Sequence, residues 1–147
     1  MSHLSVEVLG NFLKDIQTCF FKHIEYSLKY KNTSKPNAFR VLHDYIPESI
    51  QNVADEKNVG HRFSGWFGRL DHTTIHSNVF SWHKDICHEA FNANCMLISS
   101  YPYQTQFLTP TGVVTPKLGD LCLVKKDILH RAHVNSKGLS KLLIRYL

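Results

Sequence analysis

The stretch LGDLCLVKKDILHRAH, residues 118–133, contains two short runs, the first mainly apolar and the second a mixture of apolar and polar residues. A Gly-Asp pair precedes the first run, residues 120–124, and glycine tolerates the positive φ that many turns require. A Lys-Lys-Asp segment separates it from the second run, residues 129–134. Apolar runs of this length between turn formers are typical of β-strands. The stretch therefore predicts two successive strands of a β-domain.

The same alternation of short apolar runs and turns extends from residue 60 to the end of the chain. Runs of β-branched and aromatic residues predict strands at 61–69, 73–76, 79–86, 94–101, 105–109, 112–115, 120–124, 129–134 and 140–147. The segment TPTG (109–112) has the composition of a turn, because proline pre-sets φ and glycine follows it. Many short strands at this spacing predict a sandwich or barrel.

The N-terminal part has a helical pattern. Between residues 5 and 30, apolar side chains recur every three or four positions, which is the spacing of one helical face. Ser5 is a suitable helix cap, whereas Gly10 weakens the expectation of one unbroken helix. Residues 38–46 predict a strand, and residues 47–58 a short helix that begins with proline.

These elements together predict an α+β, mainly β fold. A chain of 147 residues fits a single domain, 1–147. We expect residues 1–59 to form a helical support segment that packs on a β-core made by residues 60–147.

Composition limits the classes of function. The net charge is +5, but the basic residues are scattered, so nucleic-acid binding is permitted and not indicated. The four cysteines lie in apolar stretches without a CxxC pair, which favours reduced thiols and a cytoplasmic location. The chain starts without a basic leader, and no apolar run reaches eighteen residues, so we expect neither a signal peptide nor a membrane span.

The sequence WHKD (82–85) has the spacing of a metal-binding pair. Residues i and i+2 of a strand point to the same face, so His83 and Asp85 can converge on one ion while Lys84 points the other way. Farther along the chain, His130 follows an apolar strand and Arg145 lies in the last strand. Two histidines and one carboxylate leave open positions on a metal, as in non-haem Fe(II) oxygenases. The guanidinium fork suits a carboxylate.

Residues 79–147 resemble the double-stranded β-helix, or jelly-roll, core of the Fe(II)/2-oxoglutarate-dependent dioxygenases. The resemblance covers about half of the chain and rests on WHKD (82–85), SSYPYQTQFLTPTG (99–112), GDLCLV (119–124), LHRAH (129–133) and LLIRYL (142–147). It implies Fe(II) held by His83, Asp85 and His130, and 2-oxoglutarate bound through its distal carboxylate by Arg145.

The resemblance also implies an enzyme. It would hydroxylate its substrate while 2-oxoglutarate is converted to succinate and CO2. The short chain leaves few residues to build a lid, and residues 60–80 are expected to border the mouth of the site. A shallow site of this kind favours a protein or peptide side chain, or another macromolecule, as substrate.

Some assignments stay open at this point. Lys141 has the same strand parity as Arg145 and is a rival anchor for the cosubstrate. His133 is a rival of His130 as the distal metal ligand. The two residues are three positions apart, so in a regular strand they point to opposite faces and only one of them can be the ligand. Tyr101 is either a hydrogen-bonding partner of the cosubstrate or a half-buried packing residue.

Three other functions compete with the oxygenase. A cupin-like protein would bind metal without using 2-oxoglutarate. A basic β-domain would bind nucleic acid or protein with no metal at all. A zinc site made by Cys87, His88 and Cys95 is the weakest alternative, because these residues lack the paired-cysteine spacing of structural zinc sites.

Overall fold

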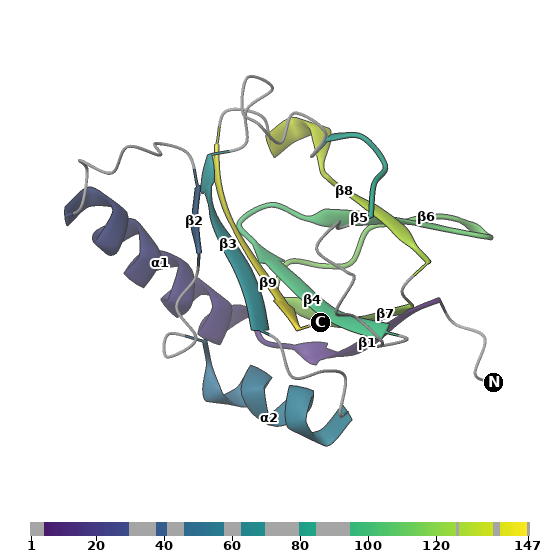
Figure 1. Ribbon diagram of the computed structural model, residues 1–147, viewed down its shortest axis with the longest axis horizontal. Coiled ribbons are helices and arrows are strands. Elements are labelled where there is room, and N and C mark those ends of the chain that lie inside the picture. Colours follow the sequence, from purple (N-terminus) through teal and green to yellow (C-terminus); the bar gives the residue numbers. More distant parts are fainter. Residues whose placement is uncertain are drawn as a thin grey trace.

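Two antiparallel sheets form the body of the protein (Figure 1). The computed structural model describes residues 5–29, 38–40, 46–57, 63–69, 80–84, 95–125, 127–136 and 139–146, with side chains left undescribed at 26–29, 38–40, 63–69 and 145–146. The larger sheet has the strand order β1 (Val6–Asn11), β7 (Asp120–Lys125), β4 (Cys95–Tyr101), β9 (Ser140–Tyr146), β3 (Phe63–Arg69) and β2 (Ala38–Arg40). The smaller sheet has the order β6 (Gly112–Val114), β5 (Thr105–Thr109) and β8 (Leu129–Ala132).

The chain winds back and forth between these two sheets. After β4 in the larger sheet it forms β5 and β6 in the smaller one, returns for β7, crosses again for β8 and ends with β9. A short 3-10 helix, η3 (Val134–Ser136), follows β8. The two helices, α1 (Leu13–Lys29) and α2 (Glu48–Lys57), lie on the side away from the smaller sheet (Figure 1). This arrangement confirms the predicted mainly β jelly-roll fold with helices packed against it.

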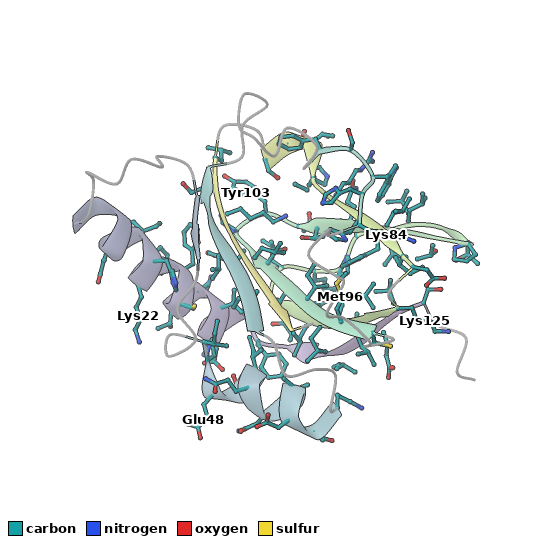
Figure 2. The ribbon with its side chains drawn as sticks, viewed as in Figure 1. Lys22, Glu48, Lys84, Met96, Tyr103 and Lys125 are labelled. Carbon is teal, nitrogen blue, oxygen red and sulfur yellow. The ribbon has the colours of Figure 1, made fainter. Side chains whose placement is uncertain are left out.

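The core divides into two clusters because each strand of the larger sheet has two faces. On β4, Leu97 packs with Ile16 and Phe20 of α1 in the first cluster. Its neighbours Met96, labelled in Figure 2, and Ile98 point the other way into the second cluster, between the sheets. Alternation with period two therefore separates a helix-facing surface from an inner surface.

The N-terminal prediction is wrong in one respect: residues 6–11 form the edge strand β1 and not the first turns of the helix. β1 pairs with β7, with a bulge between Val8 and Gly10. The helix begins at Leu13, whose N–H donates to Asn11 Oδ1 at 3.1 Å, so Asn11 and not Ser5 satisfies its first donor.

Most of the other predicted elements agree with the structure where it describes them. The strand predicted at 79–86 is an exception: of its described residues, 80–84, only His83 takes part in β-pairing, in a bridge one residue long to His130. The strands predicted at 94–101, 105–109, 112–115, 120–124, 129–134 and 140–147 are found within one or two residues of the expected ends. The strand predicted at 38–46 is described only over 38–40, and the one at 73–76 lies outside the described residues. Among the helices of the described part of the chain, none is long and apolar enough to cross a membrane.

Two of the predicted turn glycines have positive φ angles, +83° at Gly119 and +130° at Gly112. A Cβ atom at Gly119 would lie 2.5 Å from Leu13 Cα, because the turn packs on the start of α1 and Phe12 N–H donates to Gly119 O at 2.8 Å. A Cβ atom at Gly112 would meet nothing within 4 Å.

We expect Gly119→Ala to lower the free energy of unfolding by about 3 kcal/mol or more, because it adds a backbone clash to the strain of a positive φ. Gly112→Ala carries only the strain and is expected to cost about 1–2 kcal/mol. Chemical denaturation of both variants measures the difference. Equal losses would mean that the contact between the turn and α1 is looser than described.

Candidate functional site

His83 and His130 are paired in an isolated antiparallel bridge between the segment 80–84 and β8 of the smaller sheet. His83 N–H donates to His130 O at 3.1 Å, and His130 N–H donates to His83 O at 3.0 Å. Residues that exchange both hydrogen bonds in an antiparallel pair project their side chains to the same face. Residues 47 positions apart in the sequence are thereby brought together on one surface.

This surface is the inner one. His130 is 3% exposed, and its cross-strand partner on β5 is Phe107, which is buried in the cluster between the sheets. The ring centres of His130 and Phe107 lie 6.4 Å apart. His130 on β8 therefore faces the interior of the jelly roll, and the ring of His83 lies beside it.

The distance between the two imidazole rings can be compared with the distance that a shared metal ion would impose. Their centres are 4.5 Å apart and their planes are inclined at 60°. A metal–nitrogen bond is about 2.1 Å long and the ring nitrogen lies about 1 Å from the ring centre, so two rings at adjacent octahedral positions have centres about 4.5 Å apart. The observed separation matches that value.

A backbone contact fixes the tautomer of His83. Its Nδ1 lies 2.6 Å from Ser81 O, and a carbonyl oxygen can only accept, so Nδ1 carries the proton. The lone pair is then on Nε2. Histidine ligands commonly use such a hydrogen bond from one nitrogen to orient the other toward a metal.

The third predicted ligand, Asp85, lies outside the described residues. Within the described part of the chain, no group of three or more His, Cys, Asp or Glu side chains could hold a metal ion. The structure thus places two of the three predicted donors together. Of the alternative zinc site, Cys87 and His88 are also outside the described residues, and Cys95 is a partly buried residue at the start of β4.

Lys141, on β9, is a buried basic residue that bonds to β5, the strand that pairs with the strand of His130. The residue is 3% exposed, and its Nζ donates to Thr105 Oγ1 at 3.0 Å and to Gln104 O at 3.2 Å. Burial lowers the pKa of the Lys141 ammonium to about 7. On the inner face of β5, Thr105 lies two residues before Phe107, which pairs with His130. The partner of the amine is therefore displaced by about 7 Å along the strand from the residue opposite His130.

Arg145 lies at the other end of the same strand. Its backbone pairs with Ile98 of β4 and Ser64 of β3, and its side chain is not among those described. It shares the inner-face parity of Lys141 and Leu143, as the sequence predicted. Four residues of strand separate it from Lys141, which corresponds to about 13 Å.

Tyr101 and His133 have described partners outside the inner face. The ring of Tyr101 packs edge-on against Phe20 of α1 at 5.2 Å between centres, and its hydroxyl accepts from Gln17 Nε2 at 3.1 Å. These contacts match the packing interpretation of Tyr101. His133 Nδ1 accepts from Asn135 N–H at 3.2 Å at the start of η3. The structure brings His83 together with His130 and not with His133.

A small hollow of about 10 Å³, partly open to solvent, lies between β4, β5 and β7. It borders Phe107, the partner of His130, and Thr105, the partner of Lys141. Ile98 and Cys122 line its apolar part and Ser100 its polar part. Sequence reasoning did not single out Thr105 and Ser100. Thr105 could have been found from strand parity. It lies two positions before Phe107 in a strand whose bounds were predicted correctly, so the two side chains share a face.

Comparison with known proteins supports the architecture. No family model matches the chain, and no curated protein matches its sequence. Two crystal structures of the viral collagen prolyl hydroxylase from Paramecium bursaria Chlorella virus-1 are similar in fold. A truncated form has a TM-score of 0.54 at 15% identity, over 97% of this chain and 87% of that one. Its 2OG complex has a TM-score of 0.55 at 14% identity, over 97% and 94%. At this level of identity the similarity shows the fold alone.

Proposed function

We propose that the protein is an Fe(II)- and 2-oxoglutarate-dependent oxygenase that hydroxylates its substrate and releases succinate and CO2. The observation that carries the proposal is the pairing of His83 with His130, whose rings lie 4.5 Å apart on the inner face of a jelly roll. The similarity in fold to a prolyl hydroxylase crystallised with 2OG agrees with it.

In this proposal His83, Asp85 and His130 hold the metal. His83 and His130 supply neutral imidazole nitrogens, and Asp85 is the carboxylate two positions after His83 in sequence. Bound Fe(II) and 2-oxoglutarate would together activate O2, which oxidises the cosubstrate and inserts one oxygen atom into a substrate C–H bond. The sheet interior around Phe107 and Ile98 keeps bulk water away from the metal.

Lys141, and not Arg145, is the proposed anchor for the distal carboxylate of 2-oxoglutarate. Its amine donates to Thr105 Oγ1 and Gln104 O, and both of these residues line the hollow. The apolar side chains of Ile98, Phe107 and Cys122 would contact the two methylene groups. A carboxylate that pairs with a buried ammonium replaces the lost hydration of both charges.

The proposed substrate is a protein or peptide side chain. The short chain leaves few residues to cover the site, so a side chain on a larger molecule can reach it. The neighbour's name refers to collagen, and a proline-containing peptide is therefore the first substrate to test.

Anaerobic titration of the full chain, first with Fe(II) and then with 2-oxoglutarate, tests the proposal. We expect one equivalent of Fe(II) to bind, followed by a visible metal-to-ligand charge-transfer band when 2-oxoglutarate is added. Admission of O2 should then give succinate. Metal binding with no response to 2-oxoglutarate would favour the cupin-like alternative. Failure to bind any metal would favour the basic β-domain that binds nucleic acid or protein.

A further inference from the structure

The outer face of the smaller sheet carries a row of side chains that runs across its strands. Gln106 on β5 occupies the centre of this row. Its Nε2 donates to Thr115 Oγ1 at 3.2 Å, and its Oε1 accepts from Arg131 Nε at 2.9 Å. The guanidinium carbon of Arg131 lies 4.1 Å from the ring centre of Trp82. We call this row, Thr115–Gln106–Arg131–Trp82, the outer ladder.

Two members of the outer ladder are the sequence neighbours of the two histidines. Trp82 precedes His83, and Arg131 follows His130. In the antiparallel register set by the bridge between His83 and His130, Trp82 lies directly opposite Arg131. Because neighbouring residues of a strand point to opposite faces, the contact of Trp82 with Arg131 lies directly behind the contact of the two imidazoles.

From this geometry we infer that Arg131 and Trp82 are positioning residues for the pair His83 and His130. The inference deepens the proposed function. The segment 80–84 meets β8 in a bridge one residue long, so few backbone hydrogen bonds fix its register and twist in the described part of the chain. A cation over an aromatic ring adds a second point of attachment, and the bond to Gln106 fixes the guanidinium. These two points of attachment hold the segment 80–84 against rotation.

The contact also gives a physical reason for side chains that packing alone does not require. An arginine fork can bond a neighbour through Nε while its flat face stacks on an aromatic ring, which lysine cannot do. Lys84, labelled in Figure 2, is on the same outer parity as Trp82 but is exposed and outside the row. The ladder therefore depends on Arg131 in particular and not on positive charge in general.

The test compares two disruptive variants, Arg131→Met and Trp82→Leu, with two matched controls. Trp82→Phe keeps an aromatic face under the guanidinium, and Leu108→Thr alters an exposed side chain on the same outer face without touching the row. In metal-free protein, we expect hydrogen exchange of the His83 and His130 amides to rise about tenfold in the disruptive variants. Exchange within β4 reports global unfolding and should stay unchanged.

The same four variants are then titrated with Co(II) as a spectroscopic probe. We expect about tenfold weaker binding for Arg131→Met and Trp82→Leu, a value within about twofold of the wild type for Trp82→Phe, and no change for Leu108→Thr. Wild-type exchange at both histidine amides in Arg131→Met would overturn the inference. If the wild-type protein bound no Co(II), the proposed function would fail, while the exchange rates of the metal-free protein would still decide whether the ladder positions the histidines.

Discussion

His130→Ala is expected to weaken Fe(II) binding by about 100-fold or more and to remove the charge-transfer band with 2-oxoglutarate. The reason is that His130 supplies one of three proposed protein ligands, and its ring lies 4.5 Å from that of His83. Loss of a group that only orients a ligand already costs about 10–100-fold in metal affinity, and loss of the ligand itself costs more. Anaerobic absorption titration with Fe(II) measures the effect.

His133→Ala is the matched control for this variant. His133 is three residues away, and its Nδ1 accepts the N–H of Asn135 instead of facing His83. We expect its metal affinity to equal that of the wild type. His130→Gln, which keeps much of the buried volume, separates loss of a ligand from loss of folding. Retention of metal by His130→Ala together with loss in His133→Ala would reverse the assignment of the distal ligand.

The sequence predicted those parts of the fold that local chemistry decides. The turn that contains Gly119 and the one that contains Gly112 were recognised because proline and glycine have fixed backbone preferences. The strands between them followed from their length and apolar content. Residues 6–11 were assigned to a helix because Val8 continues the spacing of α1, whereas a strand partner more than a hundred residues away in β7 decides their structure. No local window contains that partner.

For the candidate site, too, the sequence predicted what is local and missed what depends on contacts between distant strands. Strand parity shows which side chains share a face, so it placed Lys141 and Arg145 on one surface of the last strand. It cannot show which end of that strand lies beside the histidines, since this depends on the register between distant strands. Tyr101 shares its strand parity with Leu97, but only the packing of α1 reveals that this is the helix-facing side of β4.

Lys141→Met is expected to weaken 2-oxoglutarate binding by about 100-fold or more and to leave Fe(II) binding intact. The ammonium is the proposed partner of the distal carboxylate, and removal of one partner of a buried charge pair costs about 3–5 kcal/mol. Arg145→Met is the matched control on the same strand and is expected to keep wild-type affinity for the cosubstrate. Titration of the Fe(II)-loaded proteins, followed by the charge-transfer band, measures both. The opposite result, with loss only in Arg145→Met, would make Arg145 the anchor.

The same substitution is expected to stabilise the protein in the absence of cosubstrate. Thr105 would keep its hydrogen bond to Ser100 Oγ, and Gln104 O would keep the one it accepts from His133 N–H. Thr105 Oγ1 still donates one hydrogen bond and Gln104 O still accepts one, so methionine removes a buried charge at little cost in hydrogen bonding. We expect a rise in Tm of roughly 5 °C near pH 6, measured by thermal unfolding.

The size of this stabilisation should depend on pH in a defined direction. Burial holds the pKa of Lys141 at about 7 in the folded protein, against 10.5 for an ordinary lysine. Between these two values the unfolded chain binds more protons than the folded one, so wild-type stability rises with pH across that window. Below pH 7 the cost of burying the ammonium is present in full, and above pH 10.5 it is gone. The advantage of Lys141→Met should therefore be largest at pH 6 and small at pH 10, whereas an advantage independent of pH would mean that packing, and not the buried charge, is its cause.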